Sequence, residues 1–380
     1  MGERLSALVS LVTPTRLPDA GFWEGRGVLV TGHTGFKGSW LVHWLARLGA
    51  RVHGLALDPP TTPSLFDTAM TGDLLASDTR ADVRDADAVR TAVRSSGASI
   101  VLHLAAQPLV RDGYRHPSET FETNVIGTTN LLEAVRVTAD VAALVVVTTD
   151  KVYRPRDPSS AEQDVPHRES DALGAEDPYA WSKVMVEHAV LAFHDLPAID
   201  GLPGWSAPVA TARAGNVVGG GDWSSERLVP DCIRAFLDGR VVQLRYPSAV
   251  RPWQHVLEPL NGYLLLAESL VTGAVLSEGE VPAFNFGPDA EGERTVGEVA
   301  SAIADRWGGS AGVSVAPEAS EPPENPLLRL DSMRARERLG WSPRWDHATT
   351  LARTADWYRR AAAGEDPADL IGEQLVDFTG

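Results

Sequence analysis

Tyr179 and Lys183 lie four positions apart in the segment Tyr-Ala-Trp-Ser-Lys. Residues i and i+4 share one face of a helix, so a helix here would bring a phenol and an ammonium group together. A nearby positive charge favours the ionised form of a phenol. The pair therefore predicts a general base that can take the proton of an alcohol. Such pairs also occur by chance on helix surfaces, so the spacing is informative only together with other motifs.

A hydroxyl, a carboxyl and an amine follow one another at Thr149, Asp150 and Lys151, directly after a run of apolar residues. A strand ending there would present all three groups where ligands of open α/β sheets bind. The hydroxyl, combined with the tyrosine and lysine pair, is sufficient for hydride chemistry at a carbinol. The adjacent acid and amine suggest a second proton transfer, such as an elimination beside the new ketone. Alternatively, Asp150 and Lys151 form a solvated ion pair at the strand end.

A glycine-rich turn lies near the start of the chain. Gly32, Gly35 and Gly38 follow the apolar residues 28–30, as in a strand that runs into a helix. Glycines let the backbone of such a turn approach a pyrophosphate at the helix N-terminus. The turn therefore predicts a dinucleotide site.

Asp58 closes the next predicted strand, about 20 residues after this turn, where an acidic side chain can bind the adenosine ribose and disfavour a 2′-phosphate. The position favours NAD over NADP. Asp58 could instead only open the Asp-Pro-Pro turn, and Lys37 or Arg80 could alter the preference. The pair Asp82 and Val83 is expected to meet the adenine.

The elements that position these groups alternate along the chain. Apolar, β-branched runs predict strands at 28–30, 52–57, 100–104, 143–148 and 209–214, and amphipathic stretches predict helices at 39–48, 86–95 and 120–137 and around Tyr179. This alternation predicts an α/β fold with a Rossmann-type doubly wound parallel sheet. Continuous apolar strands also fit a sheet covered by helices on both faces.

Three segments follow from this pattern. Residues 1–24 are an N-terminal extension, either disordered or docked, and residues 25–214 are the NAD-binding Rossmann domain. Residues 215–380 are mainly a smaller C-terminal substrate-binding lobe, with possible return segments to the first domain. Segments 213–223 and 251–258 in and near this lobe supply amide and guanidinium groups that suit a sugar pyrophosphate.

Composition excludes several classes of function. The formal charge of −17 argues against broad binding to nucleic acid or to anionic membranes. A single cysteine, Cys232, excludes an intramolecular disulfide and gives no metal-ligand set, so it is expected to be buried packing. No segment approaches the ~20 apolar residues of a membrane span. These features predict a cytoplasmic protein without a metal site.

A resemblance to a known family is carried by seven segments: 31–40, 103–111, 150–151, 177–183, 214–223, 251–259 and 339–341. With them, the chain resembles the extended branch of the short-chain dehydrogenase/reductase superfamily and, within it, the CDP-glucose 4,6-dehydratases. The related dTDP-glucose dehydratases typically have glutamate at the position of Lys151, so this lysine resembles the CDP branch. The resemblance implies an NAD cofactor, a nucleotide-sugar substrate with CDP-glucose foremost, and a homodimer or homotetramer.

The resemblance also implies roles for the chemical groups. Tyr179 would take the C4 hydroxyl proton while a hydride passes from C4 to NAD, with Thr149 bound to the same oxygen and Lys183 holding the tyrosinate and the nicotinamide ribose. Lys151 would then remove the C5 proton, and Asp150 would protonate the departing C6 hydroxyl. Return of the hydride to C6 would give a 4-keto-6-deoxy sugar.

The sites predicted in full are as follows. The cofactor site comprises Gly32, Gly35, Phe36, Lys37, Gly38, Asp58, Asp82, Val83, Leu104, Ala105, Ala106, Asn124, Thr148, Tyr179 and Lys183, and the substrate site comprises Gln107, Asn216, Arg227 and Arg251. Three alternatives remain open. They are a nucleotide-sugar 4-epimerase or 4-reductase without elimination, a dehydratase for another nucleotide sugar, and a binding protein that holds NAD without catalysis.

Overall fold

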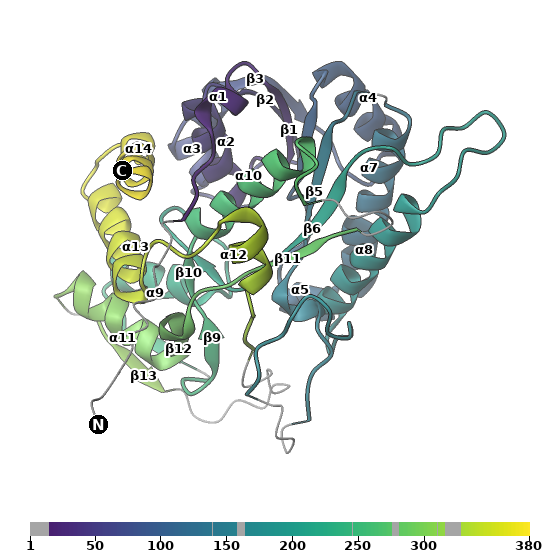
Figure 1. The fold of residues 1–380 in the computed structure, drawn as a ribbon. Helices are drawn as coiled ribbons and strands as arrows, with labels where there is room; N and C mark the ends of the chain where they lie inside the picture. Colours follow the sequence, from purple (N-terminus) through teal and green to yellow (C-terminus); the bar gives the residue numbers. More distant parts are fainter. Residues whose placement is uncertain are drawn as a thin grey trace, which may run out of the picture.

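The centre of the molecule is a parallel sheet of seven strands in the order β11-β6-β5-β4-β1-β2-β3 (Figure 1). The computed structural model describes residues 15–138, 140–157, 164–244, 246–275, 281–309, 311–315 and 328–380. The strands are β1 (Gly27–Thr31), β2 (Arg51–Ala56), β3 (Leu75–Arg80), β4 (Ile100–His103), β5 (Ala143–Val147), β6 (Val209–Ala214) and β11 (Ala283–Phe286). The strand order reverses between β1 and β4, which is the switch point where such sheets bind dinucleotides. The predicted doubly wound α/β fold is confirmed.

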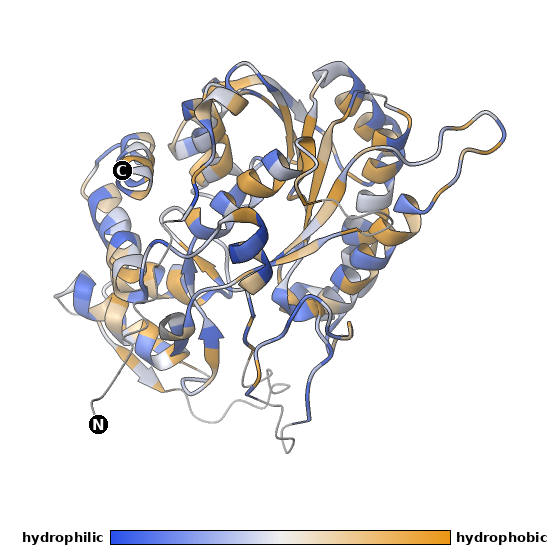
Figure 2. Cartoon of the chain, in the orientation of Figure 1, coloured by the Kyte–Doolittle hydropathy of each residue, from blue (hydrophilic) through white to orange (hydrophobic). Residues whose placement is uncertain are grey.

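Helices cover both faces of the sheet. One face carries α2 (Phe36–Arg47) and α10 (Leu257–Val271), and the other carries α4 (Ala86–Ser96), α7 (Gly127–Arg136) and α8 (Pro178–His194). Alternate strand residues point to opposite faces, so Val145 and Val147 of β5 join the first core while Leu144 and Val146 join the second. Figure 2 shows the apolar strands between helices whose outer faces are more polar.

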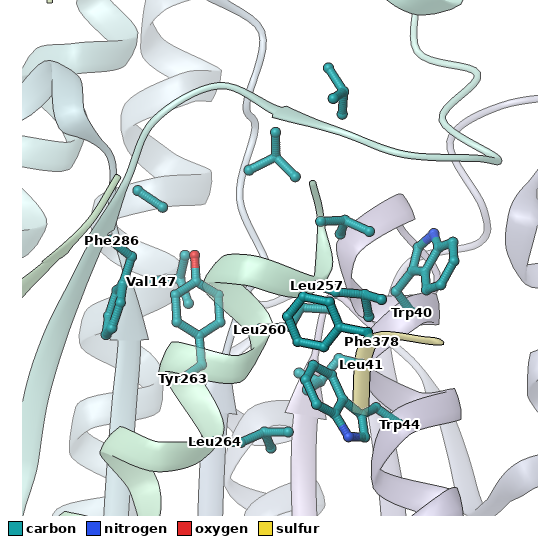
Figure 3. Packing of buried hydrophobic residues seen from close by; sticks show 14 of the residues in the cluster. Trp40, Leu41, Trp44, Val147, Leu257, Leu260, Tyr263, Leu264, Phe286 and Phe378 are labelled. Atoms are coloured by element: carbon teal, nitrogen blue, oxygen red, sulfur yellow. The ribbon is translucent and has the colours of Figure 1, made fainter. Parts of the chain in front are cut away.

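Aromatic residues fill much of the first core. Figure 3 shows Trp40 and Trp44 of α2 near Phe378 of α14 (Pro367–Thr379), with Tyr263 of α10 beside Val147. The rings of Trp44 and Phe378 meet edge to face at 5.6 Å. The C-terminal helix is thereby fixed to the helix that follows the glycine turn.

The remaining elements form the second lobe and the connections. Three two-stranded pairs join β7 (Val217–Val218) to β10 (Gln254–His255), β8 (Val242–Leu244) to β13 (Val313–Val315), and β9 (Val250–Pro252) to β12 (Glu293–Thr295). The further helices are α1 (Ala20–Trp23), α3 (Leu65–Thr68), α5 (Val110–Arg115), α6 (Pro117–Phe121), α9 (Leu228–Leu237), α11 (Val296–Trp307), α12 (Met333–Leu339) and α13 (His347–Ala362). Since α10 and β11 pack on or in the central sheet, segments after residue 214 return to it. The division at residue 214 itself stays a prediction.

The described part of the N-terminal extension is docked. The buried carboxylate of Glu268 accepts hydrogen bonds from Arg16 Nη2 at 2.6 Å, from the Asp19 amide at 2.7 Å and from Trp23 Nε1 at 2.8 Å. The Arg16 amide also donates to Gly340 O. Residues 1–14 lie outside the described residues.

The region 120–137 and the edge strand β3 differ from the sequence prediction. The helix expected over 120–137 is interrupted by a π-helical turn at Glu122–Ile126, between α6 and α7. Strand β3 was not predicted, because its sequence Leu-Ala-Ser-Asp-Thr-Arg is mostly polar and exposed at the sheet edge. Such an edge strand carries little of the apolar pattern that identifies buried strands.

Further predictions concern Cys232, membrane-spanning segments and metal sites. Cys232 is fully buried in the first core, as expected. In the part of the chain that the structure describes, no helix is long and apolar enough to cross a membrane. The same residues contain no cluster of three or more potential metal ligands from histidine, cysteine, aspartate and glutamate.

A buried histidine should make the stability of the protein pH-dependent. His255 is fully buried between Trp40 and Trp345, and burial lowers its pKa from 6.5 to about 3. The pKa of His255 is lower in the folded than in the unfolded protein, so the unfolded protein binds a proton first as the pH falls. The folded protein therefore keeps its full stability above pH 6.5 and loses stability as the pH falls from 6.5 toward 3. The expected loss from this group is about 2 kcal/mol at about pH 5.

His255→Phe keeps the aromatic packing and removes the titration. Urea unfolding at about pH 7 and about pH 5 should therefore show a smaller loss of stability in the variant, by about 2 kcal/mol. An equal loss in both proteins would contradict this assignment.

Candidate active site

Helix α8 presents Tyr179 and Lys183 to the end of β5. The helix begins at Pro178, and the side chain of Asp177 caps it by accepting a hydrogen bond from the Ala180 amide at 2.8 Å. Lys183 Nζ donates to Val147 O at 3.0 Å. Both members of the pair are buried, which fixes them against the end of the central strand.

Burial shifts the pKa values of both members of the pair. The phenol of Tyr179 has its pKa raised to about 12, because burial outweighs the hydrogen bond with Thr149. Burial also lowers the pKa of Lys183 to about 8. The expectation that Lys183 favours the tyrosinate stays a prediction. A positive charge beside the phenol opposes this rise in pKa, as Arg227 does here.

Thr149, Asp150 and Lys151 form the turn after β5. The Thr149 hydroxyl donates to Asp150 Oδ1 at 3.0 Å and caps the short 3-10 turn Asp150–Val152 by accepting from the Lys151 amide at 3.4 Å. The same hydroxyl is hydrogen-bonded to Tyr179. The two predicted groups of catalytic side chains are thus brought together.

Asp150 is buried, with 2% of its surface exposed. Its Oδ2 has no hydrogen-bond partner among the described residues, and burial raises the pKa of the carboxyl. The positive charges of Lys151, Arg251 and Lys37 oppose that rise. A solvated ion pair, the alternative interpretation of this motif, does not fit a buried carboxyl. A carboxyl in such a setting can act as a proton donor.

The glycine turn fits closely against the neighbouring strand ends. A Cβ on Gly32 would lie 2.8 Å from Ala105 N, and one on Gly38 would lie 2.1 Å from Gly32 O. Gly32 also has φ +74°, which favours glycine. The N-cap Gly35 supplies no side-chain hydrogen bond to α2, so the N-terminal amides of that helix are not capped by a side chain. These features suit a pyrophosphate.

Lys37 and Arg227 converge on the same region from opposite lobes. Burial lowers the pKa of Lys37 to about 7, and the charges that act on it are Arg227, Asp150, Lys183 and Asp222. Arg227 stands at the N-cap of α9, with Nη1 3.5 Å from Asp222 Oδ2. The predicted substrate residue Arg227 therefore lies close to the catalytic groups.

The predicted adenosine contacts lie at the outer edge of the sheet. The Asp58 side chain is 91% exposed, and Arg80 Nη1 is 3.5 Å from its Oδ1. Asp82 forms an ion pair with Arg84 at 2.6 Å. Val83 is buried against Gly127. A Cβ added to Gly127 would lie 2.6 Å from Val83 Cγ2. Contacts of these residues with a cofactor stay predictions.

Two residues predicted to contact a ligand, Gln107 and Asn124, form hydrogen bonds within the protein. The side-chain nitrogen of Gln107, Nε2, donates to Leu109 O at 3.1 Å and to Thr120 Oγ1 at 2.8 Å. Asn124 lies in the π-helical turn. Its side-chain oxygen accepts from the backbone amide of Gln107 and its side-chain nitrogen donates to Ser182 Oγ, both at 2.8 Å. Gln107 and Asn124 therefore hold the loop after β4 against α8.

Backbone groups near the switch point are fixed in a similar way. The amides of Leu104 and Ala105 both donate to Thr31 Oγ1 at 3.1 Å. Ala106 follows in the same loop and is partly exposed. The Asn216 carbonyl accepts from the Gln254 amide at 3.1 Å.

The first arginines of the segments 213–223 and 251–258 have different surroundings. Arg213 is 4% exposed and pairs with Glu187 at 2.8 Å, so its guanidinium is not available to a substrate. Arg251 is also buried; its Nη1 donates to Val250 O at 2.8 Å, and its charge acts on Asp150. Thr148 Oγ1 donates to Glu187 at 2.6 Å. Sequence reasoning missed Glu187, although its spacing of four from Lys183 was a usable signal.

The sheet order, the glycine turn and the tyrosine and lysine pair against β5 define a member of the extended short-chain dehydrogenases/reductases. The sequence model of the GDP-mannose 4,6 dehydratase family matches residues 29–354. A CDP-glucose 4,6-dehydratase of Salmonella typhimurium is 44% identical over 95% of this chain and 98% of its own. A dTDP-glucose 4,6-dehydratase of Streptomyces antibioticus is 30% identical over 90% of this chain and 94% of its own.

Solved structures agree with this relationship. The dTDP-glucose 4,6-dehydratase DesIV of Streptomyces venezuelae, solved with NAD bound, has a TM-score of 0.71 and 26% identity over 90% of this chain and 99% of its own. The chain belongs to the family of nucleotide-sugar 4,6-dehydratases that includes the CDP-glucose enzyme of Salmonella typhimurium and matches the GDP-mannose 4,6 dehydratase model. The predicted family is thereby confirmed.

Proposed function

We propose that this chain converts CDP-glucose into CDP-4-keto-6-deoxy-glucose, by oxidation at C4, loss of water across C5 and C6, and return of the hydride to C6. The observation that carries the proposal is the buried Asp150, next to Lys151 and bonded to the same Thr149 hydroxyl that reaches Tyr179. An epimerase or reductase needs no additional acid and amine at this point. The 44% identity to a CDP-glucose 4,6-dehydratase supports the choice of nucleotide.

The residues at the switch point fit NAD. Its pyrophosphate would lie on the turn of Gly32, Gly35 and Gly38, whose close packing leaves no room for side chains at two of these positions. Asp58 would bind the adenosine ribose. When bound, NAD would supply a nicotinamide ring that accepts a hydride while positively charged and gives it back from its neutral, reduced form.

The first task of the protein is to remove the C4 hydroxyl proton. Tyr179 takes it, and Thr149 hydrogen-bonds the same oxygen. Burial excludes water from this pair and raises the pKa of Tyr179, so the phenol depends on nearby positive charge to ionise. Lys183, held on Val147 O, provides an amine within the same buried region.

The second task is the elimination of water. A ketone at C4 acidifies the C5 proton, which Lys151 removes. Asp150 donates its proton to the C6 oxygen, and that oxygen leaves as water. Burial raises the pKa of Asp150, which supports its starting protonated.

A panel of nucleotide sugars tests this function. The protein, supplied with NAD and in turn with CDP-, dTDP-, UDP- and GDP-glucose, should remove water fastest from CDP-glucose, as measured by mass spectrometry of the product. Since the hydride returns to the sugar, free reduced cofactor should not accumulate. Its stoichiometric release would indicate an ordinary dehydrogenase, and an inverted C4 centre without loss of mass would indicate an epimerase.

The same family relationship supports a homodimer or a homotetramer joined through the helices around 120–137 and 178–194. Four large apolar side chains on these elements are between 43% and 50% exposed: Ile126, Trp181, Met185 and Leu191. Such a surface suits a partner copy. Light scattering should give at least twice the 40.7 kDa of one chain, and the mass of a single chain would contradict this arrangement.

A further inference from the structure

A buried carboxylate lies one helical turn beyond Lys183. Glu187 is 3% exposed and accepts four hydrogen bonds, all from side chains. Thr148 Oγ1 donates to it at 2.6 Å and Thr211 Oγ1 at 2.8 Å, while Arg213 donates through Nε at 2.9 Å and Nη2 at 2.8 Å. The ends of β5 and β6 are thereby fixed to α8, which carries Tyr179.

The other side of the Arg213 guanidinium contacts the segment after the catalytic turn. Nη1 donates to the Tyr153 hydroxyl at 3.0 Å and to Glu169 O at 3.2 Å. The Tyr153 hydroxyl in turn donates to Asn285 Oδ1 on β11 at 2.6 Å, and its ring stacks on His167 at 4.7 Å. Tyr153 is itself buried.

These contacts hold both ends of one short segment. Thr148 precedes residues 149–152 and Tyr153 follows them, and both are bonded to the same buried ion pair. The segment carries Thr149, Asp150 and Lys151, whereas Glu187 belongs to the helix of Tyr179 and Lys183. One ion pair therefore connects the groups proposed for the redox step with those proposed for elimination.

We propose that Glu187 and Arg213 are positioning residues that hold Asp150 and Lys151 in register with Tyr179 and Lys183 for the elimination step. Neither residue is exposed toward a substrate, so each acts through Thr148 and Tyr153. This inference rests on the proposed roles of Asp150 and Lys151. A buried pair with every acceptor oxygen hydrogen-bonded favours a single arrangement of the groups it connects.

Two substitutions weaken the connection without leaving a buried charge unpaired. Tyr153→Phe removes the hydroxyl at one end of the segment and keeps the stacked ring, and Thr148→Val removes the hydroxyl at the other end. Glu187→Gln is less suitable, because it leaves a buried guanidinium without its counter-charge and can prevent folding. Thr354→Val is the matched control, since Thr354 is fully buried in α13 and its hydroxyl donates to Thr350 O, its one partner among the described residues.

Single-turnover kinetics separates the two steps. With CDP-glucose and NAD, Tyr153→Phe should oxidise C4 within about 2-fold of the parent rate, whereas loss of water should slow by about 10- to 100-fold, so that bound reduced cofactor accumulates. Thr148→Val serves only for the exchange measurement below, because Thr148 is also a predicted cofactor contact. Incorporation of deuterium at C5 from heavy water should fall in parallel. The control variant should match the parent in both steps.

A second measurement needs neither cofactor nor substrate. Amide hydrogen exchange in residues 149–153 of the unloaded protein should be about 10-fold faster in the two variants than in the control. Parent-like exchange, or an equal loss of oxidation and elimination, would overturn the positioning role. A parent enzyme that forms no 6-deoxy product would instead overturn the proposed function, and the exchange measurement would still decide whether the ion pair holds this segment.

Discussion

Tyr179→Phe is expected to lower kcat by about 10²- to 10⁴-fold, the usual contribution of a general base. The variant keeps the buried ring but removes the oxygen that would take the C4 hydroxyl proton. Because the phenol is not needed to hold the adenosine half of NAD, cofactor affinity should change by less than about 10-fold. Turnover of CDP-glucose and equilibrium binding of NAD are the two measurements.

A buried tyrosine outside the catalytic turn provides the control. Tyr358→Phe removes a hydroxyl that donates to Asp222 O at 2.6 Å, and so loses a hydrogen bond without losing a proton acceptor. The loss in kcat should be far larger for Tyr179→Phe than for this control. Turnover of Tyr179→Phe near that of the parent would remove the phenol from the mechanism.

Lys151→Ala is expected to stop the reaction after oxidation at C4. Without the amine, the C5 proton stays in place, so bound reduced cofactor should accumulate while the rate of 6-deoxy product formation falls by at least about 10²-fold. Asp150→Asn should slow the same step, because an amide does not donate a proton as a carboxylic acid does. Stopped-flow absorbance of the reduced nicotinamide and mass analysis of the sugar measure the two steps separately.

Chemical rescue distinguishes a lost base from a distorted site. Added small primary amines should partly restore elimination in Lys151→Ala and should not do so in Asp150→Asn. Full elimination by Lys151→Ala without any added amine would rule out this lysine as the base.

The features predicted correctly from sequence are those that depend on neighbours in the chain. The strand, glycine turn and helix around Gly32, and the spacing of Tyr179 and Lys183, are written in local periodicity. The apolar run before Thr149 likewise predicts where β5 ends. Each of these elements is present within a few residues of its expected position.

The features that the sequence did not reveal arise only when distant segments meet. Arg213 has the chemistry of a phosphate ligand, but its partner Glu187 lies 26 positions earlier and occupies the guanidinium in the folded protein. Burial raises the pKa of Tyr179, which the spacing to Lys183 does not reveal. An edge strand such as β3 lacks the apolar pattern because it is covered on fewer sides.

The fate of the C4 hydrogen tests the central claim most directly. CDP-glucose that carries deuterium at C4 is converted in ordinary water with unlabelled NAD, and the product is examined by NMR. The proposed function predicts that the deuterium is recovered at C6 of the 4-keto-6-deoxy sugar, together with a solvent hydrogen at C5. Deuterium that remains at C4, or that leaves the enzyme with the cofactor, would contradict an internal oxidation, elimination and reduction.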